Sequence, residues 1–152
     1  MAFVKFININ PQGGVPKFST EKTFIGETKV DGDKQNDLKH HGGPNRAVCL
    51  FSDEIITLLQ KEGHPIKPGS TGENLTIKGL DWTKMKEGLI LTIGDIKLEI
   101  TGPAAPCKTI AKSFKNESFI RISEKINPGY SRWYAKVLKK AVIYRNDVVN
   151  IL

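Results

Sequence analysis

The sequence contains few cysteines, and this scarcity excludes several classes of protein. Cys49 and Cys107 are the two cysteines among 152 residues, they lie far apart, and no Cys-x-x-Cys pair occurs. A disulfide framework or a dithiol redox centre is therefore not indicated, and a reducing cytoplasm is the expected compartment. The cysteines and the histidines His40, His41 and His64 lack zinc-finger spacing, so we expect no structural zinc site.

Long apolar runs are lacking as well. No segment approaches the roughly 18 consecutive apolar residues of a membrane-spanning helix, so we expect no membrane association. Residues 1–5 lack the basic start, apolar stretch and cleavage site of a signal peptide and are expected to begin a strand. With 39% hydrophobic and 26% charged residues, the chain is expected to form a single domain over residues 1–152.

Aromatic residues are also sparse, at 8% of the chain, whereas basic residues are in excess. Lysine and arginine number 23 against 16 acidic residues, which gives a formal net charge of +7. This excess favours an anionic partner, although a solvated lysine-rich surface accounts for it equally well. A nucleic-acid-binding barrel is disfavoured, because the aromatic residues are not interleaved with basic ones as base-stacking surfaces require.

The secondary structure predicted from the sequence consists mainly of short strands. Apolar and β-branched segments bounded by Gly, Pro and Asn indicate strands, and the alternation around Gly94-Asp95 indicates a hairpin. A helix is predicted to begin after the N-cap Ser52 and to end at Gly63. The expected strands are 3–9, 23–30, 47–51, 75–77, the hairpin 89–101, 133–144 and 148–152, with a second helix over 117–126. This pattern predicts a mainly β fold, a β-barrel with a few short helices.

Cys107 has the environment best suited to chemistry. It follows the segment 103–106, Pro-Ala-Ala-Pro, and precedes residues expected to open a short helix, whose first turn Pro106 favours through its fixed φ. A helix N-terminus and the neighbouring Lys108 both favour the thiolate, which is the nucleophile and the soft metal ligand. A small buried residue in a turn is the alternative interpretation.

Two further polar loops contain candidate binding residues. Glycines expose backbone N–H groups, the fork of Arg46 suits phosphate, and a histidine titrates near neutrality. The structural alternatives are that Asn74 closes its own turn, that Glu73 pairs with a surface lysine and that Arg46 is solvated. The candidates are His41, Gly42, Gly43 and Arg46 in the first loop, and Glu73 and Asn74 in the second.

These loops belong to an ordered series of short motifs. The series comprises Val30–Gln35, His41–Val48, Gly72–Thr76 with Gly79-Leu80, Leu91–Asp95, Pro106-Cys107 and Trp133–Leu138. No single motif is specific, but their order over most of the chain resembles the MOSC domain family, named for the C-terminal domain of molybdenum cofactor sulfurase. The chain departs from that pattern at Ala104-Ala105, where members often have an arginine, and at Asn146-Asp147, where a Gly-Asp turn is common.

The resemblance implies a small β-barrel with an accessible Cys107. In the family this cysteine is proposed to carry sulfur as a persulfide or to bind the molybdenum of a pterin cofactor, the molybdenum cofactor (molybdopterin). Some relatives reduce N-hydroxylated bases and amidoximes. The residues that the resemblance places in the cofactor pocket are His41, Gly42, Gly43, Arg46, Glu73 and Asn74, with Lys108 or Arg46 replacing the missing arginine.

Two function classes follow from this resemblance. The first is a protein that uses Cys107 as persulfide carrier or molybdenum ligand and supports reduction of N-hydroxylated compounds. The chain contains no pyridoxal-phosphate desulfurase domain and no iron–sulfur or flavin module, so an external sulfur donor or electron-transfer protein is the expected partner. The second is a non-catalytic binding module for a phosphorylated pterin or another small anion. The residues do not decide whether the protein is an enzyme.

Overall fold

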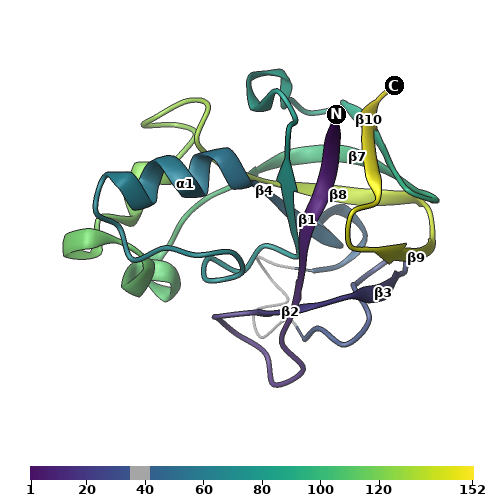
Figure 1. The fold of residues 1–152 in the computed structure, drawn as a ribbon, viewed down its shortest axis with the longest axis horizontal. Helices are drawn as coiled ribbons and strands as arrows, with labels where there is room; N and C mark the ends of the chain where they lie inside the picture. Colours follow the sequence, from purple (N-terminus) through teal and green to yellow (C-terminus); the bar gives the residue numbers. More distant parts are fainter. Residues whose placement is uncertain (35–41) are drawn as a thin grey trace.

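Seven strands close into a barrel in the computed structural model, which describes residues 1–34 and 42–152. The barrel strands lie in the order β10-β6-β7-β8-β4-β5-β1, and β1 pairs again with β10. Figure 1 shows β1 and β10 side by side, with the two ends of the chain close together. The bounds are β1 (Ala2–Ile9), β4 (Val48–Ser52), β5 (Leu75–Lys78), β6 (Ile90–Ile93), β7 (Ile96–Ala104), β8 (Arg132–Lys139) and β10 (Val148–Ile151). The predicted mainly β barrel is therefore confirmed.

One parallel strand pair explains the position of the helix. β4 and β5 run parallel, and a parallel pair needs a crossover connection, which begins with α1 (Asp53–Lys61). The side chain of Ser52 caps this helix by accepting a hydrogen bond from the backbone N–H of Ile55 at 3.2 Å. Helix, cap and end agree with the sequence prediction.

The two faces of the barrel sheet carry different residues. Ile96, Leu98 and Ile100 alternate along β7 and are fully buried, together with Leu50 of β4 and Ala135 of β8. These residues form part of the main apolar core. The opposite face of the same strands carries the polar side chains of the site described below.

The remaining elements are short. β2 (Phe18–Thr20) extends the barrel sheet beside β1, and β3 (Lys22–Ile25) pairs with β9 (Ala141–Tyr144). None of the helices within residues 1–34 and 42–152 has the length and apolar character needed to cross a membrane. The 3₁₀ turns are η1 (Pro44–Arg46), η2 (Trp82–Lys84), η3 (Lys108–Ser113), η4 (Lys115–Glu117) and η5 (Phe119–Ile122).

Three sequence predictions are wrong in detail. In place of the helix expected over 117–126, the structure has the end of η4 and the 3₁₀ turn η5 (Phe119–Ile122). Asn116 and Glu117 both have φ 55°, which is outside the right-handed helical region. The strand expected over 23–30 ends at Ile25 and folds back through Gly26, so that only a single bridge joins Ile25 to Val30. The strand expected over 133–144 breaks at Lys140, where the chain leaves β8 to pair with a different sheet as β9.

Candidate functional site

Cys107 lies at the surface, three residues beyond the end of β7. It is exposed, and its Sγ lies 2.9 Å from the hydroxyl oxygen of Thr109. It immediately precedes η3 and its carbonyl accepts a hydrogen bond from the N–H of Ile110 at 3.1 Å. The predicted position at a helix start is confirmed, although the helix is a 3₁₀ turn and Pro106 lies before it. The buried-turn alternative for Cys107 is wrong.

The second cysteine has the opposite environment. Cys49 is buried on β4, as the sequence predicted, and burial raises the pKa of its thiol to about 11. It forms a small apolar cluster with Ala104 and Tyr134, which faces it across the β4–β8 pair. Of the two thiols, Cys107 is therefore the one open to a reaction partner.

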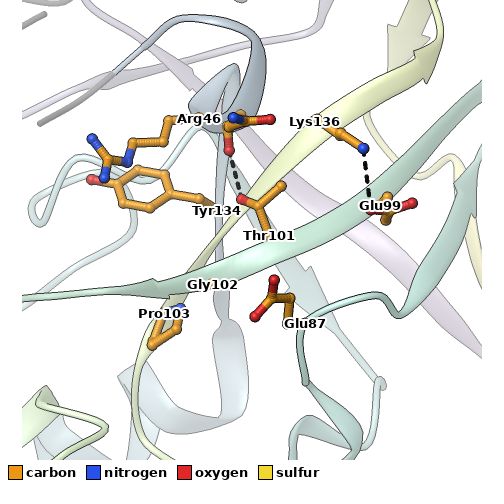
Figure 2. A pocket seen from close by; sticks show the side chains of 9 residues that line it. Arg46, Glu87, Glu99, Thr101, Gly102, Pro103, Tyr134 and Lys136 are labelled. Atoms are coloured by element: carbon orange, nitrogen blue, oxygen red, sulfur yellow. Dashed lines mark hydrogen bonds and ion pairs between the residues drawn. The ribbon is translucent and has the colours of Figure 1, made fainter. Parts of the chain in front are cut away.

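A hollow of about 320 Å³ lies beside Tyr134. Arg46 approaches the Tyr134 ring at 5.8 Å from its centroid, and Lys136 pairs with Glu99 at 3.3 Å. Figure 2 shows both pairs around the hollow, with Glu87 on the side opposite Arg46. The lining residues are Asn45, Arg46, Glu87, Glu99, Thr101, Gly102, Pro103, Tyr134 and Lys136, and Cys107 is not among them.

Local hydrogen bonds hold Arg46 at this edge. Arg46 ends η1, and the hydroxyl of Thr101 on β7 donates a hydrogen bond to the carbonyl of Asn45 in the same turn. Burial raises the pKa of the Tyr134 phenol, so its hydroxyl stays protonated and can donate a hydrogen bond. Gly102 forms part of the wall, and a Cβ added there would meet no atom within 4 Å.

Glu73 faces into the protein rather than toward the hollow. It is fully buried, and its carboxylate accepts hydrogen bonds from the N–H of Gly69 and the hydroxyls of Thr71 and Thr76, all at 3.0–3.1 Å. Burial raises the pKa of this carboxyl. The surface-lysine alternative is wrong. Contact between Glu73 and a cofactor stays a prediction.

Asn74 is likewise fully buried, and it connects three segments. Its Oδ1 accepts the backbone N–H of Cys49 at 3.0 Å, and its Nδ2 donates to Asp33 at 2.9 Å. Asp33 in turn receives Lys17 Nζ at 2.6 Å, in a pair whose side chains are no more than 4% exposed. These side-chain bonds join Asn74 to distant segments and not to its own turn, so the turn-closing alternative is wrong. Contact between Asn74 and a ligand stays a prediction.

Arg132, which the sequence analysis did not select, joins two of the candidate loops. Its Nη1 donates to the carbonyl of Thr71 at 2.6 Å, and its Nη2 lies 3.5 Å from the carbonyl of Ala105. Arg132 stands directly opposite Ala104 in the β7–β8 pairing. From the neighbouring strand, the Arg132 guanidinium thus contacts the backbone of the segment that precedes Cys107.

The other predicted site residues are placed as follows. Lys108 is exposed and begins η3 directly after Cys107. Gly42 and Gly43 lead into η1, and both have φ 78°, a backbone conformation that favours glycine. His41 lies outside the described residues. Within residues 1–34 and 42–152, no group of three His, Cys, Asp or Glu side chains could hold a metal ion.

Fold and site define a class, a small β-barrel with one accessible cysteine at the end of a barrel strand. Residues 37–150 match the MOSC domain model, and the chain belongs to this family. It is 30% identical over 112 residues to YflK of Bacillus subtilis, covering 72% of this chain and 49% of that protein. It is 27% identical over 119 residues to YiiM of Escherichia coli, covering 76% and 52%.

Solved structures agree on the fold. The crystal structure of YiiM from Geobacillus stearothermophilus superposes with a TM-score of 0.76 at 21% identity, covering 100% of this chain and 75% of that one. YuaD from Bacillus subtilis gives 0.75 at 19% identity, covering 97% and 93%. This chain spans about half the length of YflK and Escherichia coli YiiM.

Proposed function

We propose that this protein acts in molybdenum-cofactor chemistry through Cys107, as a persulfide carrier or as a ligand of the cofactor's molybdenum. The observation that supports this most strongly is the exposed thiol of Cys107 at the end of a barrel strand. Family membership supports a role related to this cofactor. Cys49 is too deeply buried to take the same part.

As a sulfur carrier, Cys107 needs a donor persulfide, R–S–S⁻. The Cys107 thiolate attacks the terminal sulfur of the donor, the donor S–S bond breaks, and the donor leaves as a thiolate. The product is a persulfide on Cys107, one sulfur heavier than the thiol. No net oxidation occurs, because the transferred sulfur keeps its oxidation state.

The residues around Cys107 fit a metal ion whose other ligands are supplied by the cofactor itself. A single soft thiolate at Cys107 is available, and the described residues hold no all-protein metal cluster. Arg46 and Lys108 would hold the anionic groups of the pterin. When bound, the molybdenum cofactor would supply two-electron chemistry for N-hydroxylated compounds, with an external electron-transfer protein as reductant.

The test is sulfur loading followed by intact mass. After incubation with a low-molecular-weight persulfide, the protein should gain about 32 Da, the mass of one sulfur, and peptide mapping should place it on Cys107. The matched control is Cys49→Ser, which should load like the wild type, whereas Cys107→Ala should not load. Loading that survives in Cys107→Ala would contradict the carrier role.

One observation favours a second candidate, a non-catalytic module that binds a phosphorylated pterin or another small anion. The hollow beside Arg46 and Tyr134 does not include Cys107 in its lining. This candidate predicts unchanged pterin-phosphate affinity in Cys107→Ser and at least tenfold weaker binding in Arg46→Ala, measured by calorimetry. Loss of binding in Cys107→Ser would exclude it.

A further inference from the structure

Arg132 is a buried cation without a carboxylate in contact. The residue is 4% exposed, and no carboxylate lies within ion-pair distance of it in the described part of the chain. Its Nε is buried and has no hydrogen-bond partner among residues 1–34 and 42–152. Of its five N–H donors, one makes a short bond, to Thr71, and another a long one, to Ala105.

A buried cation without a counter-charge destabilises the fold. A buried charge without a paired counter-charge costs several kcal/mol, so buried arginines are normally found in ion pairs. Thr71 links Arg132 to the buried carboxylate of Glu73, because its carbonyl accepts from Arg132 and its hydroxyl donates to Glu73. In the low-dielectric interior, the charge of Arg132 therefore acts on whatever anion lies next to it.

The neighbouring segment is the one that carries the reactive thiol, residues 105–107, here called the Cys107 loop. Arg132 reaches the carbonyl of Ala105, and two residues of chain place the Cα of Cys107 at most about 7.6 Å from that of Ala105. The residues of this loop are exposed or half-buried. The guanidinium thus lies beneath the loop, while reaction partners approach from the solvent side.

We propose that Arg132 is the positioning residue of the Cys107 loop and that its buried charge selects anionic reaction partners for Cys107. This rests on the proposed carrier function for its biological meaning, because a donor persulfide is an anion that must approach a thiolate. The two negative sulfurs repel each other, and a cation beneath the loop offsets this repulsion. Arg132 touches neither sulfur and acts through the loop and through its field.

Two alkylating reagents of similar size, one anionic and one neutral, test this field. Iodoacetate and iodoacetamide both form an S–C bond at Cys107 and release iodide, but iodoacetate is an anion. Both rates depend in the same way on the thiolate fraction and on the accessibility of the thiol, so these two factors cancel in the ratio of the rates. We expect the iodoacetate to iodoacetamide ratio to fall roughly threefold to tenfold in Arg132→Met and to be largely retained in Arg132→Lys.

Lys108 provides the matched control, since it adjoins Cys107 but is exposed. Its effect should vanish at 0.5 M salt, where exposed charges are screened, whereas the effect of Arg132 should persist. The proposal would be overturned if the iodoacetate to iodoacetamide ratio were unchanged in a folded Arg132→Met variant. It would also be overturned if the ratio fell equally in Arg132→Lys.

The Lys108→Met variant, which retains Arg132, keeps the proposal testable if Arg132→Met does not fold. At 0.5 M salt, the native Lys108→Met variant should still show a higher ratio than the same chain in denaturant. Equal ratios would overturn the proposal. This outcome is distinct from failure of the carrier function, because alkylation requires neither sulfur donor nor cofactor.

Discussion

At the scale of single residues, the two cysteines differ in exposure and in surroundings. Cys107 is exposed beside a 3₁₀ turn, whereas Cys49 is enclosed by the β4–β8 pair. Burial raises the pKa of Cys49 to about 11, so it carries almost no thiolate near neutrality.

We expect one of the two thiols to react in the folded protein. At pH 8, excess iodoacetamide should modify Cys107 to completion while Cys49 remains unmodified, because Cys49 is both inaccessible and protonated. Intact mass should show one carbamidomethyl group in buffer and two in denaturant. Rapid double modification of the native chain would contradict the burial of Cys49.

Glu73 makes a prediction about pH. Because burial raises its pKa in the folded state, the folded protein holds this proton more tightly than the unfolded chain does. The loss of stability from ionising Glu73 is absent below the pKa that this carboxyl has in the unfolded chain. It grows as pH rises from that value to the pKa in the folded protein. Glu73→Gln, which mimics the protonated carboxyl, should therefore gain stability relative to the wild type as pH rises.

Urea unfolding of the wild type and Glu73→Gln at pH 4 and pH 7.5 measures this difference. Each unit by which the pKa is raised corresponds to about 1.4 kcal/mol in favour of the variant at the higher pH. Thr76→Val, which removes one donor to the Glu73 carboxylate, should enlarge the pH dependence. A stability difference independent of pH would show that the folded state does not perturb Glu73.

At the scale of elements, a buried ion pair joins segments that are far apart in the chain. Lys17 Nζ lies 2.6 Å from both carboxylate oxygens of Asp33, and Asp33 also accepts the backbone N–H of Asn10 and the amide of Asn74. This network connects the end of β1 with the turn that precedes β5. Through Asn74 it supports the second polar loop from within.

Removal of one partner from this pair should destabilise the fold strongly. Lys17→Met removes the Lys17 cation from the buried Asp33 carboxylate, and breaking a buried pair typically costs about 3–5 kcal/mol in the free energy of unfolding. Lys5→Met, at a half-exposed pair with Asp53, is the matched control and should cost under about 1 kcal/mol. Chemical denaturation compares the two, and equal losses would contradict the account.

The hollow between β7, β8 and η1 offers a substitution that fills space without strain. A Cβ at Gly102 would meet no atom within 4 Å, and β-branched residues suit a strand. Gly102→Val should therefore leave the unfolding midpoint unchanged or raised, while weakening pterin-phosphate binding about tenfold or more in calorimetry. Unaltered affinity would place the ligand outside this hollow.

Parts of this site could be predicted from sequence and parts could not. The strand, the proline-rich loop and the helix start around Cys107 leave local signals. The burial of Glu73 and Asn74 leaves no local signal in the sequence. A Gly- and Thr-rich turn with polar residues has the same sequence pattern whether it is exposed or buried. Arg132 depends on its pairing with Ala104, which follows two register shifts along β7–β8 that no periodicity encodes.

At the scale of the whole molecule, closure of the barrel determines which loops meet. The sequence predicts a barrel from many short strands, but the pairing of β1 with β10 and the parallel pairing of β4 with β5 join distant segments. The position of the Cys107 loop beside the Thr71–Asn74 turn follows from this strand order through Arg132. The cytoplasmic location expected from cysteine usage stays a prediction.

The net charge of +7 also belongs to this scale. Basic side chains outnumber acidic ones over the chain, yet the hollow itself balances Arg46 and Lys136 against Glu87 and Glu99. An anionic partner stays a prediction, and its general attraction would come from the surface as a whole rather than from the balanced charges of the hollow.

The most direct test of the central claim is the sulfur and molybdenum content of one purified sample from a host that makes the molybdenum cofactor. Elemental analysis and intact mass should be run together on the wild type and on Cys107→Ala. The account predicts near-stoichiometric molybdenum, or about 32 Da of added mass at Cys107, and loss of that signal in the variant. The same molybdenum or sulfur content in both proteins, or neither signal in the wild type, would contradict it.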